Sequence, residues 1–156
     1  MTDFAEAFNR GQQAAALAVR ARHEIAEIFT TASQQLSEIT NGKLELSRQE
    51  FEKPQKSLTT FAAARALEGF FGRVAVETEP WIAARNPKES DPRWVKLAKW
   101  DQPQEGFPCV LSYDKKDVRC HNQEALADAI AELLASPWAG ERLHELVERP
   151  VKPEAV

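Results

Sequence analysis

Residues 4–39 read FAEAFNRGQQAAALAVRARHEIAEIFTTASQQLSEI, and apolar or small side chains recur along them in alternating steps of four and three. This spacing places the side chains on one side of an α-helix, in the pattern of a heptad seam. Asn41 and Gly42 follow, two residue types that tolerate the left-handed conformation ending many helices. The pattern therefore predicts one helix of about 36 residues, on the order of 54 Å long. The seam comprises Phe4, Phe8, Gly11, Ala15, Ala18, Ile25, Phe29, Ala32, Leu36 and Ile39, and Arg22 interrupts it.

A helix of this length outspans a domain of 156 residues, so another element has to cover its seam. There are two alternatives for the element that covers the seam: later segments of the same chain, or a second copy in a homodimer. The small residues in the middle of the seam would let a second backbone approach closely. The seam composition differs from the β-branched residues and leucines of parallel two-stranded coiled coils. For the homodimer we expect these buried anchors: Phe4, Phe8, Ile25, Phe29, Leu36 and Ile39.

The rest of the chain predicts a sheet and further helices. Period-two alternation over 43–47 indicates a short strand, and a capping serine begins a second apolar helix over 57–72. Strand-like segments separated by turn residues then fill 73–122, which indicates an antiparallel meander. Two helical segments occupy 123–149, the second with a capping serine followed by proline at its first position.

Length and composition fit one ordinary globular domain, with 43% hydrophobic and 28% charged residues. We expect an α+β domain over 1–149, in which the long helix and further helices pack on one face of a mostly antiparallel sheet of about four or five strands. The tail at 150–156 is polar, contains two prolines and is expected to be disordered. Asp3 stands where a signal peptide carries basic residues, and no apolar run approaches the roughly 20 residues of a membrane span. We therefore expect a cytoplasmic protein that does not enter a membrane.

The charge distribution singles out one strip of the chain. A net charge of −4 and a pI near 5.5 exclude a protein whose whole surface is built to hold nucleic acid. Residues 85–100, however, hold five basic residues against two acidic ones, a balance of +3. On a regular strand Trp94, Lys96 and Trp100 share one face, beside Arg93. Rings interleaved with cations suit single-stranded nucleic acid or an aromatic-rich partner, whereas the alternative is a core face on an edge strand protected by lysines.

Cys109, Cys120 and His121 form the one cluster that suggests a nucleophile or a metal site. A hairpin centred on 115–116 would place Leu111 opposite Cys120 and Cys109 diagonal to it, roughly 7–8 Å away, which is longer than most disulfides permit. Side chains alternate along a strand, so His121 would point away from Cys120. We expect two reduced core thiols without a catalytic role.

The remaining polar residues give no known chemical signature. His23 and His144 lie on outward helix faces and have no second ligand one turn away. Glu77 and Glu79 share one strand face, as in a metal-dependent nuclease, but no suitably spaced lysine follows. The sequence lacks nucleotide-binding, zinc-protease and serine-hydrolase motifs. We therefore predict no catalytic, metal or cofactor site.

These observations favour a noncatalytic protein-interaction module of the adaptor, chaperone, inhibitor or immunity type that acts as a homo-oligomer. The sequence does not identify its protein partner, for which the expected surface is Arg93, Trp94, Lys96 and Trp100. One alternative is a nucleic-acid-associated protein that uses the strip at 85–100. The other is an enzyme or small-ligand carrier with an unrecognised pocket between helices and sheet.

Overall fold

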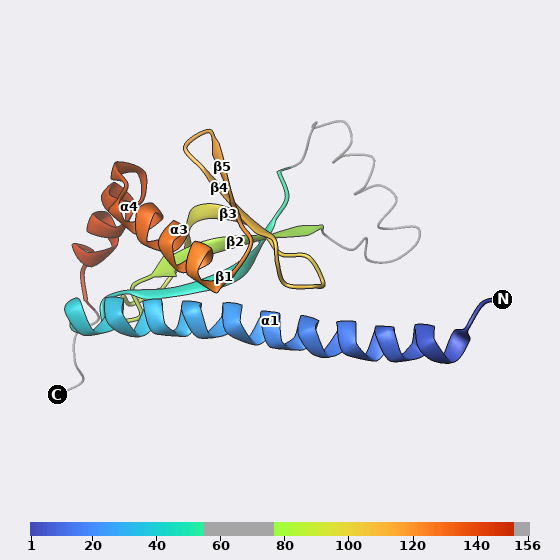
Figure 1. The fold of residues 1–156 in the computed structure, drawn as a ribbon. Coiled ribbons are helices and arrows are strands. Elements are labelled where there is room, and N and C mark those ends of the chain that lie inside the picture. Colours follow the sequence, from blue (N-terminus) through green and yellow to red (C-terminus); the bar gives the residue numbers. More distant parts are fainter. Residues whose placement is uncertain (55–76, 152–156) are drawn as a thin grey trace, which may run out of the picture.

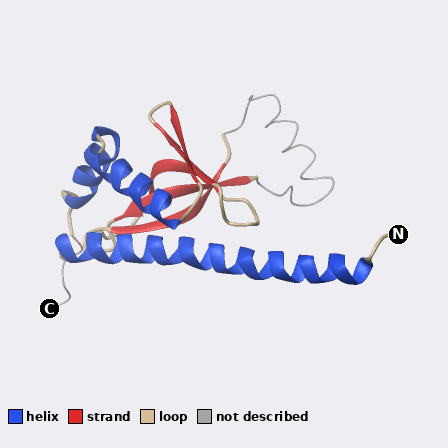
Figure 2. Ribbon diagram, viewed as in Figure 1, coloured by secondary structure: helices blue, strands red, loops and turns tan. Residues whose placement is uncertain are grey.

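The computed structural model describes residues 1–54 and 77–151. Over these residues the fold is α+β, with three helices on one side of a five-stranded antiparallel sheet, as predicted (Figures 1 and 2). The helix expected over 57–72 and the end of the chain at 152–156 lie outside the described residues.

The long helix α1 spans Phe4–Ile39, which confirms the predicted element of 36 residues. Asp3 caps its first turn, where the carboxylate accepts the backbone N–H of Glu6 at 3.1 Å. Beyond its last residue, Asn41 and Gly42 adopt left-handed backbone conformations with φ of 55° and 81°. Both ends of the helix are therefore set by local side-chain and backbone preferences.

The sheet is a simple meander, in which each strand pairs antiparallel with the next along the chain. Two helices follow it, α3 at Gln123–Ala135 and α4 at Pro137–Val147, with caps at Asn122 and Ser136. None of the helices within the described ranges is both long and apolar enough to cross a membrane. The strands are β1 (Glu45–Glu52), β2 (Thr78–Arg85), β3 (Val95–Asp101), β4 (Cys109–Tyr113) and β5 (Lys116–Cys120).

The core lies between the sheet and the three helices, and α1 runs along the sheet beside α3 (Figure 1). Ile25 and Phe29 of α1 belong to one buried cluster with Leu46 of β1, Leu111 of β4 and Leu133 of α3. The opposite face of the sheet is not covered by α1, α3 or α4. The described part of the chain is thus a two-layer structure with one open sheet face.

A β-bulge between β2 and β3 changes which side chains share a face. Ile82 pairs with Ala98 whereas Ala83 pairs with Lys96, so Leu97 is an extra residue on β3. The extra residue turns Trp100 toward the helices, where it is only 3% exposed. The prediction that Trp100 shares a face with Lys96 is therefore wrong, because regular alternation does not hold across the bulge.

The hairpin between β4 and β5 is centred one residue earlier in the chain than predicted. Asp114 and Lys115 both have positive φ, 48° and 63°, and form a two-residue turn in which Tyr113 pairs with Lys116. Cys109 consequently lies directly opposite Cys120 instead of diagonal to it. The predicted register is wrong because the turn is centred one residue earlier.

Candidate functional site

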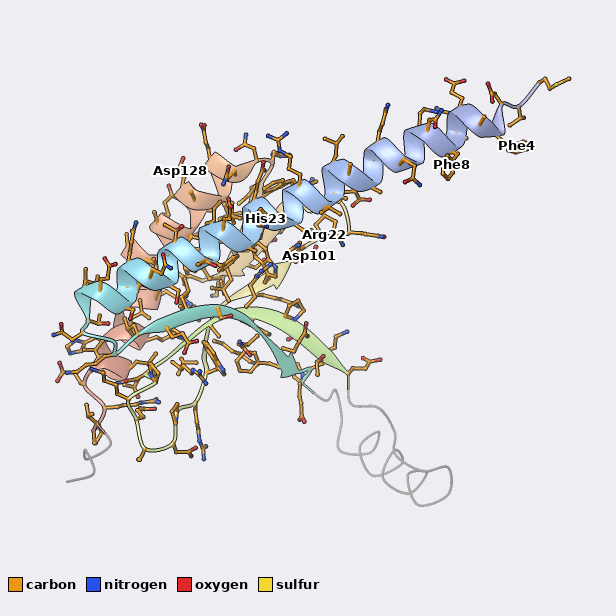
Figure 3. All side chains as sticks on the ribbon, turned by 90° about the horizontal axis from the view of Figure 1, so that it is seen from below. Phe4, Phe8, Arg22, His23, Asp101 and Asp128 are labelled. Atoms are coloured by element: carbon orange, nitrogen blue, oxygen red, sulfur yellow. The ribbon has the colours of Figure 1, made fainter. Side chains whose placement is uncertain are left out.

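The N-terminal half of α1 extends beyond the sheet (Figure 3). Near Ala21 the loop after β3 approaches α1 so closely that a Cβ on Gly106 would lie 2.7 Å from the Cβ of Ala21. From Phe4 to Arg20 every side chain but that of Ala18 is exposed. We call residues 4–20 the free half of α1; at 1.5 Å per residue it is about 25 Å long.

The predicted seam is divided between these two parts of the helix. Ile25 and Phe29 are buried against their own sheet, and Leu36 is half-buried beside them. We therefore no longer expect Ile25 and Phe29 to contact another chain. Phe4 and Phe8, by contrast, are 78% and 65% exposed. Ile39, the last seam residue, is also exposed.

Arg22 interrupts the seam at the point where α1 leaves the body (Figure 3). Its side chain is exposed, although its backbone nitrogen lies 3.3 Å from the position of a Cβ on Gly106. A charged residue is tolerated at this seam position because it lies at the edge of the sheet layer and not beneath it. The break in the pattern therefore marks the boundary between the covered and the exposed seam.

An apolar groove of about 700 Å³ runs between the C-terminal half of α1 and α3. Sequence reasoning missed it. One stripe of α3, Leu126, Ala129 and Leu133, faces the core, and the groove uses a neighbouring stripe. The helical spacing of Ala127, Ala131 and Leu134 is only a weak signal for the groove, because two of these three side chains are alanines. We refer to this feature as the α1–α3 groove; its apolar lining residues are Ile28, Ala32, Leu36, Ile39, Ala127, Ile130, Ala131 and Leu134.

The basic and aromatic strip lies on the open face of the sheet, with partners that the sequence did not reveal. The ammonium group of Lys96 is 4.7 Å from the ring centroid of Trp81 and 5.1 Å from that of Phe51. The guanidinium of Arg85 lies 4.6 Å from the ring centroid of Trp94. Pairs of this kind are cation–π contacts, and they fix rings from three neighbouring strands or their ends on one surface.

Several cations around this surface are already paired with carboxylates. Arg85 contacts Glu45 at 2.7 Å, and Lys99 contacts Glu79 at 3.5 Å. The indole N–H of Trp81 also donates to Glu79, which lowers the pKa of that carboxyl, and Lys99 adds to the effect. Arg93 is exposed and pairs with Asp91 at 3.1 Å. The positive charge of the strip is therefore largely compensated locally.

The two cysteines are buried, reduced and face the core. Burial raises the pKa of Cys109 to about 12, with the neighbouring Cys120 adding to the shift, and burial likewise raises the pKa of Cys120. A thiol that stays protonated is a poor nucleophile. Over residues 1–54 and 77–151, no three His, Cys, Asp or Glu side chains are grouped to hold a metal ion.

This environment makes a prediction for thiol labelling. With a pKa of about 12, only about one part in ten thousand of Cys109 is thiolate at pH 8. We expect neither native cysteine to react with iodoacetamide under these conditions on a scale of minutes, and both to react in guanidinium chloride, as measured by mass spectrometry. His121→Cys is the matched control, since position 121 is exposed and adjacent to Cys120. Native labelling as fast as in this control would contradict the buried arrangement.

Comparison of the chain with models of protein families, with curated proteins and with solved structures found no match in any of the three. A function therefore has to be inferred from the surfaces of the chain. Three are candidates: the free half of α1, the α1–α3 groove and the open face of the sheet.

Proposed function

We propose that this chain is a noncatalytic protein-interaction module of the adaptor, chaperone, inhibitor or immunity type, that it acts as a homo-oligomer, and that the free half of α1 is its binding element. The observation that carries the proposal is the exposure of Phe4 and Phe8 on a helix that has left the body. They lie one turn apart, so both point to the same side. Aromatic anchors at this spacing are used by amphipathic helices that dock into apolar grooves.

The energetics of the free half support the same conclusion. Most of the stability of helices in proteins comes from packing of an apolar face, and the side chains of the free half are almost all exposed. Fully burying an aromatic side chain contributes roughly 1.5–3 kcal/mol. The rings of Phe4 and Phe8 do not gain this free energy while they stay in solvent. A partner that covers this face would stabilise the helix and bury the rings together. The noncatalytic part of the proposal is supported by the two thiols, which are buried and protonated.

The proposal predicts that Phe4→Asp with Phe8→Asp converts the oligomer into monomers. Two carboxylates would have to be buried in the contact, so we expect the dissociation constant for self-association to rise by about 100-fold or more. Sedimentation equilibrium over a concentration series measures it. The melting temperature of the monomer should stay unchanged, since neither phenylalanine touches the core.

The matched control is Asn9→Asp with Ala16→Asp, which adds the same charge to the opposite side of the free half. This control should associate like the parent chain. A parent chain that is monomeric at all accessible concentrations, or a Phe4 and Phe8 variant that associates as well as the control, would show the proposal to be wrong.

Association with nucleic acid through the strip at 85–100 is the second candidate. Rings of Phe51, Trp81 and Trp94 share the open sheet face with Lys96, as in proteins that stack unpaired bases. The pairing of Arg85 and Lys99 with carboxylates weakens this candidate, because phosphate groups would have to displace those partners. Protein binding is the better-supported function.

A further inference from the structure

We infer that the α1–α3 groove receives the free half of α1 from a second copy of this chain, so that two copies exchange their helices reciprocally. The inference rests on the proposed function and adds the identity and the seat of one binding partner. Each chain carries one exposed apolar helix and one apolar groove. The helix of one copy would fill the groove of the other, and the groove would cover the helix.

The two features match in length. On α1 the groove is lined from Glu27 to Ile39, which is 13 residues or about 20 Å of helix. The free half offers 17 residues, of which the stretch from Phe4 to Ala16 has the same length. A helix seated there would contact α1 on one side and α3 on the other, which is the helix-in-groove mode of recognition.

The two features also match in shape. The groove lining alternates the small side chains of Ala32, Ala127 and Ala131 with larger apolar ones such as Leu36 and Leu134. The incoming helix offers bulk at one end, where Phe4 and Phe8 lie, and small residues toward its middle. Bulky side chains on one helix that fit between small ones on its neighbours allow close packing of helix ridges.

Charge is complementary as well. The free half, residues 4–20, contains Arg10 and Arg20 against the single acid Glu6, a balance of +1, and Arg20 also pairs with Glu24 of its own helix at 3.4 Å. Glu27 lines the groove, and the exposed Glu124 and Asp128 stand on α3 beside the lining alanines (Figure 3 labels Asp128). Among residues 1–54 and 77–151, no lysine or arginine lines the groove. Opposite charges of this kind favour the intended pairing and orientation.

Symmetry turns the single contact into a closed assembly. A two-fold axis perpendicular to α1, near the middle of the helix, makes the two copies of α1 antiparallel. The free half of each chain then lies along the C-terminal half of the other, and both contacts form at once. An arrangement of this kind is isologous and ends at a dimer, without unsatisfied grooves or helices.

The test changes the groove and leaves the free half intact. Ala127→Arg with Ala131→Arg places two bulky, charged side chains in the groove, in the space where the incoming helix would have to pack. Both alanines are exposed, so the fold should tolerate the change. We expect the dissociation constant of the dimer to rise by about 100-fold or more in sedimentation equilibrium. The matched control, Ala135→Arg with His144→Arg, adds the same charges at exposed positions outside the groove and should dimerise normally.

A second measurement locates the contact directly. Chains carrying Gln12→Cys are mixed with chains carrying Ala131→Cys and treated with a flexible bismaleimide; the two native thiols are buried. We expect a cross-linked heterodimer, and none when Lys115→Cys in the β4–β5 turn replaces Ala131→Cys. A dimer that Phe4→Asp with Phe8→Asp breaks, but that survives the groove variant and gives no cross-link, overturns this inference and leaves the proposed function standing. A parent chain that stays monomeric overturns both.

Discussion

Replacing Phe29 by alanine is expected to lower the free energy of unfolding by about 3–5 kcal/mol, the usual cost of deleting a buried aromatic side chain. Phe29 is 5% exposed and packs edge-on against Trp100, with ring centroids 5.3 Å apart. The guanidinium of Arg48 lies 4.9 Å from the Phe29 centroid and would lose that contact too. Urea titration followed by tryptophan fluorescence measures the loss.

Phe8→Ala is the matched control for this prediction, since the same residue type is deleted from the same helix. Its ring is exposed and belongs to the free half, so we expect a change within about 0.5 kcal/mol at concentrations where the chain is monomeric. Equal losses for the two variants would mean that α1 does not divide into a covered and a free half as described.

Gly106→Ala is expected to lower the free energy of unfolding by about 2–4 kcal/mol, because two costs add. Gly106 has φ of 93°, a conformation that strains any residue with a side chain. The new Cβ would also lie 2.7 Å from the Cβ of Ala21, which forces α1 or the loop to move. Chemical denaturation measures the total, and hydrogen exchange near Ala21 should show the displacement.

Gly140→Ala makes the same chemical change in α4, where a Cβ meets nothing within 4 Å. Alanine has the better helix propensity, so this variant should be neutral or more stable by up to about 1 kcal/mol. If Gly106→Ala were as harmless as Gly140→Ala, the close approach of the loop to Ala21 would be wrong.

Much of the fold was predictable because it depends on local rules. The cap at Asp3 and the left-handed residues Asn41 and Gly42 define α1, and turn residues separate the strands of the meander. Helix caps at Asn122 and Ser136 likewise begin α3 and α4. Each of these features depends on a few neighbouring residues, so the sequence alone is sufficient.

The register of the strands could not be predicted so well, since it depends on single-residue choices. One extra residue at Leu97 moved Trp100 from the expected partner surface into the core. One residue of difference in the turn at Asp114 and Lys115 brought Cys109 opposite Cys120. Neither the bulge nor the shifted turn changes the hydrophobic pattern of its own strand enough to be predicted without knowing the register of the neighbouring strand.

The candidate site was predictable in part. A heptad seam identifies the apolar side of α1 but not the element that covers it, so Phe8 and Phe29 look equivalent in sequence although only one is buried. The α1–α3 groove depends on which stripe of α3 the sheet leaves uncovered, and Ala127 and Ala131 carry too little hydrophobicity to reveal it. The aromatic cluster around Lys96 joins strands that are distant in sequence.

Gly11 lies inside the free half of α1, and no other group lies within 4 Å of where its Cβ would be. Glycine disfavours a helix by about 1 kcal/mol relative to alanine. A partner that binds the free half only as a helix requires residue 11 to be helical in the complex. Gly11 therefore lowers the affinity of a partner for the free half by about fivefold, although its missing side chain makes no contact with that partner.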